Sequence, residues 1–401
     1  MKRAGHQAAL PILFLCVFVD MLGYGMIVPL LPFIVREQSD RALLVGLLSS
    51  LYALMQLLVA PLLGALSDQI GRRPILIACL LGSALAYSLL ALATWLGLLP
   101  LIITAIALGG AAGASLPTAQ AYIADRTNPD QRAQGLGMVG AAFGFGLMIG
   151  PASGGLLSQF GLAVPALVAS ALALLNAVFA TLALPESLPP ERRSRHPMRP
   201  DGLPAQIAGA LATPALRPLL LAIFLLNLAF AGLQSNFPLF SNVRFGWDAS
   251  ANGLFFAFVG LCAILTQGVL IGLLQRWLGE AALVLGGLAL MAVGLALAAL
   301  APQAWLLYPL VGLMAVGLGL AIPALTSLVT HRTPEGQQGA TLGGMQAILS
   351  LALIGGPALA GLLFDLAGPQ APYLVGSLLA AGALIAATWG LGPRRIITDH
   401  S

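Results

Sequence analysis

Charged residues are scarce in this chain of 401 residues. Asp, Glu, Lys and Arg together make up 8% of it, whereas 59% of its residues are hydrophobic. A soluble globular domain carries about 25% charged residues. So few charges cannot cover a surface that faces water, and the composition therefore excludes a soluble globular protein and indicates an integral membrane protein.

Cysteine and histidine are also rare. Cys16, Cys79 and Cys262 stand at unrelated spacings inside apolar runs, which gives neither a disulfide framework nor a metal-binding pattern. The four histidines fall in tails or loops, and the sequence contains no zinc-protease motif, nucleophile elbow or P-loop. We therefore expect no enzyme, no cofactor and no metal, and we do not expect ATP to be the energy source.

Long apolar runs dominate what is present. A helix that crosses a bilayer needs about 20 mostly apolar residues, whereas a membrane β-barrel would show short alternating segments. The sequence predicts an all-α membrane protein with twelve transmembrane helices, the first of which is too long for a cleaved signal peptide. The runs lie near residues 8–35, 43–66, 75–96, 99–124, 134–158, 163–184, 216–240, 250–274, 281–300, 303–330, 338–364 and 370–391.

The basic residues favour one orientation, because Lys and Arg stay on the cytoplasmic side of membrane proteins. With both termini inside, only Arg36, Arg41 and Arg244 fall outside, and all other Lys and Arg residues fall inside. We expect a multi-pass protein of a bacterial inner membrane with cytoplasmic termini. The net charge of +4 then reflects insertion rather than nucleic-acid binding, although a basic patch at 192–199 is the alternative.

The chain contains an internal repeat. An ungapped offset aligns Arg126-Thr127 with Arg332-Thr333 and Gly150-Pro151 with Gly356-Pro357. A nearby offset aligns the loop 64–73 with 272–281, with the glycines kept and the charges inverted. Two related six-helix halves indicate a transporter built from parallel repeats.

The repeat divides the chain into domains. The polar stretch at 186–204 is rich in Pro and Arg, which suits a cytoplasmic linker. We expect an N-terminal six-helix bundle over 1–185, a linker over 186–213 and a C-terminal six-helix bundle over 214–401.

The loop GALSDQIGRRP (64–74) is a candidate conformational switch. Its glycines permit close approach and a sharp turn. Asp68 can pair with a basic residue of the other half, and Arg72 with an acid such as Asp125, so that charges at helix ends hold one conformation closed. Alternatively, the two arginines only set topology. The candidate switch residues are Gly64, Asp68, Gly71, Arg72, Arg73 and Asp125.

A single acid lies within an apolar run. Asp20 interrupts the first run, whereas every other Asp and Glu falls in a loop, a tail or a helix end. A charge there costs about 2.5–3.5 kcal/mol on the insertion scale, and no embedded Lys or Arg offsets it. We expect Asp20 to take up a proton near neutral pH and to release it to water, as a proton-coupling site must. The alternative is a structural carboxyl that is hydrogen-bonded to a neighbouring helix.

Uncharged polar residues in the runs are candidates for substrate binding, because lipid cannot hydrogen-bond them. Asn227 occupies the place in the second half that Asp20 occupies in the first, so the two would face each other across a pseudo-twofold axis. Each polar residue could instead serve helix packing. So few charges favour a lipophilic, weakly polar ligand. The candidates are Tyr24, Gln56, Gln120, Asn227, Gln234, Asn236, Gln267 and Gln346.

Two motifs resemble a known family. The pattern G-x-x-x-D-x-x-G-R-R at 64–73 resembles the signature loop of the major facilitator superfamily. GFGLMIGPASGG (144–155) resembles the fifth-helix pattern of its proton antiporters, in which glycines let helices pack closely and proline bends the helix. The resemblance implies the major facilitator fold of two pseudo-symmetric six-helix bundles. The matching antiporter residues are Gly146, Gly150, Pro151, Gly154 and Gly155.

Longer stretches resemble the tetracycline–proton antiporter branch of the drug:proton antiporters: 20–32, 51–74, 244–249 and 322–330. In that branch an aspartate stands in the first helix at the place of Asp20. Further aspartates stand in the third and ninth helices and an arginine in the fourth. Here Ala86 and Ile106 take two of these places, and 286–294 contains no acid. These departures predict a chain that does not specialise in tetracycline.

We therefore expect a proton-coupled antiporter that exports lipophilic drugs or related small molecules by alternating access. Its expected partners are a small lipophilic substrate, the proton and the lipid bilayer, with no nucleic acid, and we expect a monomer. The alternative is a proton-linked or facilitative transporter of a sugar or another nutrient, against which the fifth-helix pattern argues. Nothing in the sequence supports a membrane enzyme or a receptor.

Overall fold

The computed structural model describes residues 2–127, 129–194, 203–334 and 338–392, so that 195–202 of the expected linker lie outside the described residues. These described ranges form helices and no β-strand. A bilayer offers no hydrogen-bond partner to backbone N–H and C=O groups, and a helix satisfies them within one segment. The predicted all-α membrane fold is confirmed.

Eleven segments of the described residues are long and apolar enough to cross a membrane. One of them, Ala249–Leu300, has 52 residues, about twice the length that one crossing needs. Its backbone leaves the helical region at Gly279 (φ 74°, ψ 166°). The segment therefore makes two crossings joined by a turn, and the described residues give the twelve spans that the sequence predicts.

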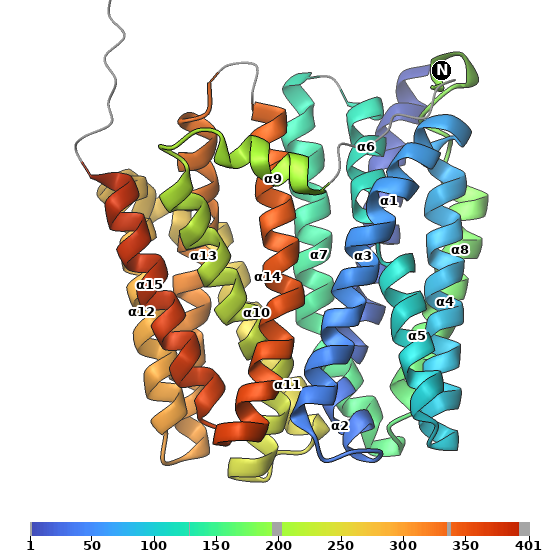
Figure 1. Ribbon diagram of the computed structural model, residues 1–401. Helices are drawn as coiled ribbons and strands as arrows, with labels where there is room; N and C mark the ends of the chain where they lie inside the picture. The colour runs from blue at the N-terminus through green and yellow to red at the C-terminus, as the bar shows by residue number, and fades with distance from the viewer. Residues whose placement is uncertain (1, 128, 195–202, 335–337, 393–401) are drawn as a thin grey trace, which may run out of the picture. The chain divides into compact units, whose positions relative to one another are not determined.

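The first of two compact units comprises Met1–Pro200 and Ser241–Gly260. In it, α1 packs against α7 and α8, α4 against α5 and α8, and α3 against α5 (Figure 1). Its elements are α1 (Lys2–Ile27), α2 (Leu31–Arg36), α3 (Ala42–Ile70), α4 (Arg72–Leu96), α5 (Leu99–Ala112), α6 (Leu116–Arg126), α7 (Pro129–Leu157), η1 (Ser158–Phe160), α8 (Val164–Ala183) and η2 (Pro190–Arg192).

The second unit comprises Asp201–Phe240 and Leu261–Ser401. Here α12 packs against α13 and α15, and α9 lies across the end of α14 (Figure 1). Its elements are α9 (Leu203–Leu211), η3 (Thr266–Leu270), α12 (Ile271–Leu300), η4 (Ala304–Leu306), α13 (Leu307–His331), α14 (Gln338–Ala367) and α15 (Ala371–Leu391). Two helices, α10 (Arg217–Phe245) and α11 (Ala249–Leu265), run through both units. The expected division of the chain at the linker stays a prediction.

Two spans of the first unit are interrupted. The first span breaks between α1 and α2, at residues 28–30, and the fourth breaks between α5 and α6, at 113–115. A proline stands at or just after each break, at Pro29 and Pro117. Because proline has no N–H and its ring crowds the carbonyl four residues earlier, each break leaves a backbone carbonyl without its helical partner.

The internal repeat is visible in matching local contacts. Thr127 Oγ1 donates to the carbonyl of Ile123 over 2.8 Å, and Thr333 Oγ1 donates to that of Val329 over 2.7 Å. In each half this threonine follows the helix that ends the fourth span of that half. The aligned threonines therefore close equivalent helix ends.

The loop after the second span of each half also repeats. Gly71 (φ 112°, ψ 157°) and Gly279 (φ 74°, ψ 166°) both leave the helical region. The residue that follows each glycine faces the end of a later helix, and the charges are inverted as the sequence predicts. Arg72 lies 3.2 Å from Asp125 in the first unit, and Glu280 lies 3.8 Å from His331 in the second.

We predict that Gly71→Ala destabilises the protein more than Gly279→Ala. Both glycines have a positive φ, which costs an L-residue about 1–2 kcal/mol. A methyl group at Gly71 would also overlap the carboxylate of Glu186, whereas nothing lies within 4 Å of one at Gly279. Thermal unfolding of both variants in detergent measures the difference, and equal midpoints would contradict this account of the loop.

Candidate functional site

Asp20 lies in α1 with 8% of its surface exposed, and it is the only buried acid among the described residues. Ser83 of α4 donates to its Oδ1 over 3.5 Å, and Ser115 donates to its Oδ2 over 3.4 Å. Both bonds are longer than the usual O–H···O separation of about 2.5–3.0 Å. No Lys or Arg in the described ranges forms an ion pair with Asp20. Neutral groups therefore hold this carboxyl loosely.

Asn176 fixes α1 one turn before Asp20. Its Nδ2 donates to the carbonyl of Cys16 over 2.8 Å, and only 4% of the residue is exposed. Its Oδ1 accepts no hydrogen bond from the described residues. Sequence reasoning missed Asn176, Ser83 and Ser115, although an isolated polar residue in an apolar run is a usable signal.

Tyrosine side chains surround Asp20. The rings of Tyr24 and Tyr52 have centroids 5.2 Å apart, and the ring of Tyr87 lies against Gly23. Tyr52 and Tyr87 both interact electrostatically with Asp20. All three tyrosines are half-buried, so the site combines one carboxyl with aromatic surface. Of the three, the sequence analysis selected Tyr24 alone.

Two further candidates lie in the first unit. Gln56 of α3 is half-buried, and its Nε2 donates to the carbonyl of Gly113 over 3.0 Å. Gln120 of α6 is exposed. Gln56 therefore reaches the break in the fourth span that also carries Ser115.

The remaining polar candidates lie in the second unit. Asn227 is buried and donates to the carbonyl of Ile223 on its own helix over 2.8 Å. Asn236 is buried, and its Oδ1 accepts no hydrogen bond within the part of the chain that the structure describes. Gln234 is half-buried. Gln267 and Gln346 are exposed. The pairing of Asn227 with Asp20 across a pseudo-twofold axis stays a prediction.

The positions at which the resemblance implies charges are packed with apolar groups. Ala86 of α4 is 2% exposed and Ile106 of α5 is 6% exposed. A methyl group added at Gly109 would lie 3.7 Å from the Cβ of Ala86. This part of the first unit is therefore a close-packed apolar contact between α4 and α5.

Glycines of α7 form a close contact with α1 around Asp20. A Cβ atom on three of them would collide with the backbone or side chains of α1. The collisions would be Gly146 with Met21 (2.6 Å), Gly150 with Gly25 (2.7 Å) and Gly154 with Met26. Small residues at this spacing let two helices approach closely, so α7 holds the segment of α1 that follows Asp20.

The other edge of α7 contacts α11 within the first unit. A Cβ on Gly155 would lie 2.9 Å from the Cα of Gly253 and from the carbonyl of Ala249, and one on Gly253 would overlap the carbonyl of Pro151. This contact gives the physical reason why residues 241–260 pack with the first unit. The expected antiporter motif therefore binds two helices, α1 and α11, while its role in antiport stays a prediction.

The candidate switch loop forms a polar network around Arg72, which is 9% exposed. Its guanidinium contacts Asp125 at 3.2 Å, Asp68 at 2.5 Å and the hydroxyl of Ser67 at 2.6 Å. The pairing with Asp125 is the one that the sequence indicated. Asp68, expected to pair with the other half, binds Arg72 in this structure.

Glu186 closes the start of α4, and sequence reasoning missed it. Its Oε1 accepts from the N–H of Arg72 over 2.9 Å and its Oε2 from that of Arg73 over 3.3 Å. Carboxylates stabilise helix N-termini through such bonds. The side chain of Arg73 donates to the carbonyl of Thr181. An acid directly after the sixth apolar run was the signal that could have indicated this role.

The structure shows no close approach at Gly64 among the described residues, and its role in the switch stays a prediction. Gly64 lies within α3, and no described atom is within 4 Å of a Cβ placed there. The close approach occurs at Gly71, where a Cβ would overlap the Glu186 carboxylate. Because α3 continues to Ile70, the sharp turn of the motif lies at Gly71.

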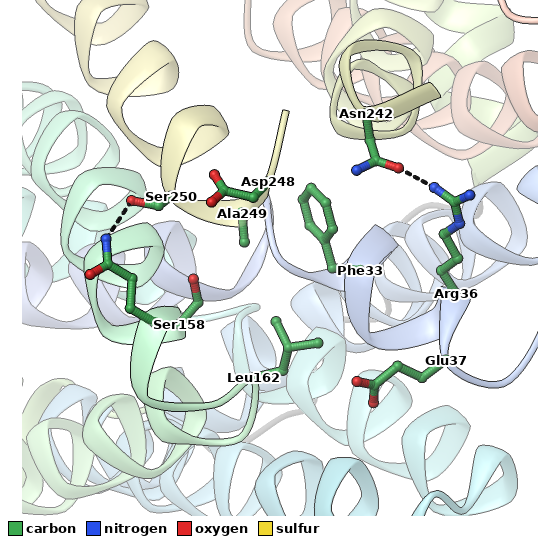
Figure 2. A pocket seen from close by; sticks show the side chains of 10 residues that line it. Phe33, Arg36, Glu37, Ser158, Leu162, Asn242, Asp248, Ala249 and Ser250 are labelled. Carbon is green, nitrogen blue, oxygen red and sulfur yellow. Dashed lines mark hydrogen bonds between the residues drawn. The ribbon is translucent and has the colours of Figure 1, made fainter. Parts of the chain in front are cut away.

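A cavity of about 420 Å³ lies at the end of α2 in the first unit (Figure 2). Arg36 donates to Asn242, and Gln159 Nε2 donates to Ser250 Oγ over 2.9 Å. The first bond joins α2 to the end of α10, and the second joins η1 to the start of α11. The cavity is lined by Phe33, Arg36, Glu37, Ser158, Gln159, Leu162, Asn242, Asp248, Ala249 and Ser250.

A metal centre does not emerge from the described residues, because no group of three or more His, Cys, Asp or Glu side chains in them is placed to hold an ion. Asp248, the acid nearest the start of α11, instead accepts from the N–H of Ala251 over 2.7 Å and caps that helix.

Sequence comparisons agree with this geometry. The chain matches the family described as the Major Facilitator Superfamily over residues 13–291 and 268–397. It is 35% identical over 352 residues to the class C tetracycline resistance protein of Escherichia coli, covering 87% of this chain and 88% of the relative. It is also 30% identical to human Hippocampus abundant transcript-like protein 1, over 90% of this chain and 74% of the relative.

Solved structures agree in fold. The human organic anion transporter MFSD10 (TETRAN) matches with a TM-score of 0.72 at 26% identity, over 95% of this chain and 99% of that chain. The nucleoside transporter NupG matches with a TM-score of 0.76 at 12% identity, over 96% of this chain and 99% of that chain. At such low identity, the second likeness concerns the fold alone.

We predict that Gly150→Ala disturbs the first unit and that Gly144→Ala does not. Both glycines lie on α7, but only Gly150 faces the backbone of α1, whereas nothing lies within 4 Å of a Cβ at Gly144. Overpacking of this kind costs about 1–3 kcal/mol. Thermal unfolding in detergent measures the loss, and a Gly150→Ala midpoint equal to that of Gly144→Ala would contradict the close contact.

Proposed function

Because this chain belongs to the major facilitator superfamily, in the branch of the tetracycline resistance proteins, we propose that it is a proton-coupled antiporter that exports lipophilic small molecules. Family membership makes it a multi-pass membrane transporter. Proton coupling and the class of the substrate are the parts that we propose.

The observation that carries the proposal is the isolation of Asp20. It is the only buried acid of the described residues, and two serine hydroxyls rather than a cation contact it. A lone carboxylate is expensive inside a membrane span, so a proton neutralises it whenever the site is closed to water. When the site opens to the side with fewer protons, water stabilises the ionised form and the proton leaves.

This exchange can drive export if the substrate and the proton occupy the site in turn. Movement of the proton into the cell down its gradient then drives export of the substrate against its gradient. Each conformational change carries either the proton or the substrate across the membrane. The glycine contacts of α7 with α1 and α11 provide packed surfaces that hold Asp20 in place during that cycle. The buried network of Arg72 gives the conformational switch a charged contact to open and close.

The surroundings of Asp20 favour a lipophilic substrate. Half-buried tyrosine rings supply apolar surface, and Gln56 supplies a hydrogen-bonding group. Apolar Ala86 and Ile106 stand where the resemblance implies charges, which leaves few groups to bind a strongly polar or charged part of a substrate. We therefore propose that tetracycline, which names several relatives, is not the preferred substrate here.

The orientation completes the proposal. We propose that both termini lie in the cytoplasm of a bacterial cell and that the protein lies in the inner membrane, which the excess of Lys and Arg on one side of the spans supports. A monomer suffices, because each chain holds both halves of the repeat.

We predict that Asp20→Asn abolishes transport driven by a pH gradient and leaves the protein folded, because asparagine keeps the size of the side chain but cannot exchange a proton. Asp40→Asn is the matched control, since Asp40 is exposed in the loop before α3. Proteoliposomes with an imposed pH gradient measure substrate movement. Uphill transport by Asp20→Asn would overturn the assignment.

The substrate class is tested with the same vesicles and a panel of compounds: ethidium, tetraphenylphosphonium, tetracycline and a neutral lipophilic dye. We expect one or more of the lipophilic compounds to release protons from the vesicle lumen in the wild type and to fail in Asp20→Asn. Tetracycline is expected to give a weaker response than the best compound. A flat response to the whole panel would favour the nutrient transporter instead.

A further inference from the structure

The break in the fourth span lies just before a proline. Pro117 has no N–H to donate to the carbonyl four residues earlier, which belongs to Gly113, and its ring crowds that carbonyl. The helix stops at Ala112 and resumes at Leu116. The freed carbonyl of Gly113 accepts a hydrogen bond from Gln56 Nε2 over 3.0 Å.

The break carries Ser115 to Asp20. Ser115 is the last residue of the break, and its hydroxyl lies 3.4 Å from Asp20 Oδ2. Ser83, the other hydroxyl on this carboxyl, belongs to the regular helix α4. One oxygen of Asp20 is therefore held from a continuous helix, and the other from a turn whose position depends on its own contacts.

The contacts that position this turn come from Tyr52 and Gln56 of α3. A Cβ at Gly113 would overlap the hydroxyl of Tyr52, and one at Gly110 would overlap the backbone carbonyl of Tyr52. Tyr52 also packs against Tyr24, which lies one turn after Asp20. Gln56 lies one turn after Tyr52 on α3. Gln56 and Tyr52 thus hold the break in the position that brings Ser115 to the carboxyl.

The second half of the repeat lacks this arrangement. Pro323 is the counterpart of Pro117, yet α13 runs unbroken from Leu307 to His331. Ala321 stands at the place of Ser115 and Asn227 at that of Asp20. Proline alone therefore does not produce the break. The break, the hydroxyl and the acid occur together in one half and are absent together from the other.

We propose that Ser115 is a positioning residue that couples the occupancy of the Tyr52 and Gln56 surface to the protonation of Asp20. This inference rests on the proposed function. A hydroxyl that donates to a carboxylate stabilises the ionised form. A ligand that fixes Tyr52 and Gln56 holds Ser115 against Asp20, and the proton leaves as the ligand binds.

The sign of this coupling matches antiport. Because coupling between two ligands is reciprocal, protonation of Asp20 weakens ligand binding as much as the ligand weakens proton binding. Gln56 is suited to the ligand contact, since it is half-buried and its Nε2 holds the break.

Other titratable groups near Asp20 are few. α5 and α8 contain none. Tyr122 of α6 belongs to the buried cluster that also contains Cys16 and Met21 of α1, whereas the charged residues of α6 and α7 lie at the end of α6 and in the first turn of α7. The groups that interact with Asp20 electrostatically come from α1, α3 and α4: Cys16, Tyr52, Cys79 and Tyr87. None of these residue types is charged near neutral pH in its ordinary state, so Asp20 can be followed on its own.

The test follows the protonated carboxyl of Asp20 by infrared spectroscopy of the full-length protein in lipid nanodiscs without ligand. The C=O stretching band that is present in the wild type and absent from Asp20→Asn is assigned to the protonated carboxyl of Asp20. We expect Ser115→Ala to retain the band to a higher pH, by about one pH unit, the size of one lost hydrogen bond to a charged group. Ser115→Thr keeps the hydroxyl and is expected to resemble the wild type.

The decisive comparison uses Gln56→Ala, which removes no group that touches Asp20. We expect Gln56→Ala to shift the titration of the Asp20 band to higher pH when it is made in the wild-type protein or in the Ser83→Ala variant. In the Ser115→Ala variant, we expect Gln56→Ala to cause no further shift. Thermal unfolding confirms that each variant is folded. A Gln56→Ala titration equal to that of the wild type, or an equal shift in Ser115→Ala, would overturn the relay. A Ser115→Ala titration equal to that of the wild type would overturn it as well. If no band titrates in the wild type, the proposed function fails too.

Discussion

The rest of the structure depends on the free-energy cost of placing a carboxyl group inside a membrane span. Asp20 has no cation to neutralise it among the described residues, and its contacts are two long hydrogen bonds from serines. A group in this position is stable when it is protonated or when water reaches it. The same property that makes Asp20 unfavourable as a structural residue makes it useful to a transporter, because changing its access to water changes its charge.

The helices around Asp20 are shaped to hold it while part of its surroundings can move. Small residues of α7 bring that helix against the backbone of α1, and Asn176 ties α1 to α8 one turn earlier. Against this fixed frame stands the break in the fourth span, which lies just before Pro117 and is stabilised by a glutamine from α3. Close packing provides the precision of the site, and the interrupted helix provides a part that can change its position without unfolding.

Much of the fold could be predicted from the sequence, because a membrane restricts the chain to apolar helices of a set length. The twelve spans, the inverted charges at Arg72 and Glu280 and the embedded acid all follow from composition and periodicity. The partners of Asp20 did not follow, since Ser83, Ser115 and Asn176 are separated from it by many residues, and short polar side chains are common in such helices. Only Gly71 of the two motif glycines makes a close contact, because a motif gives the order of its residues but not where the helix ends. Glu186 was missed because an acid in a loop looks like any solvated charge until its backbone partners are known.

The central claim is that binding of a substrate expels the proton of Asp20. A pH electrode or a soluble indicator can follow this directly when ethidium is added to the purified full-length protein in weakly buffered solution, with binding measured in parallel by fluorescence. The account predicts release of about one proton per bound ethidium in the wild type, as strong coupling of substrate binding to one carboxyl requires, and none in Asp20→Asn although ethidium still binds. Equal proton release by the two proteins, or binding to the wild type without any release, would contradict it.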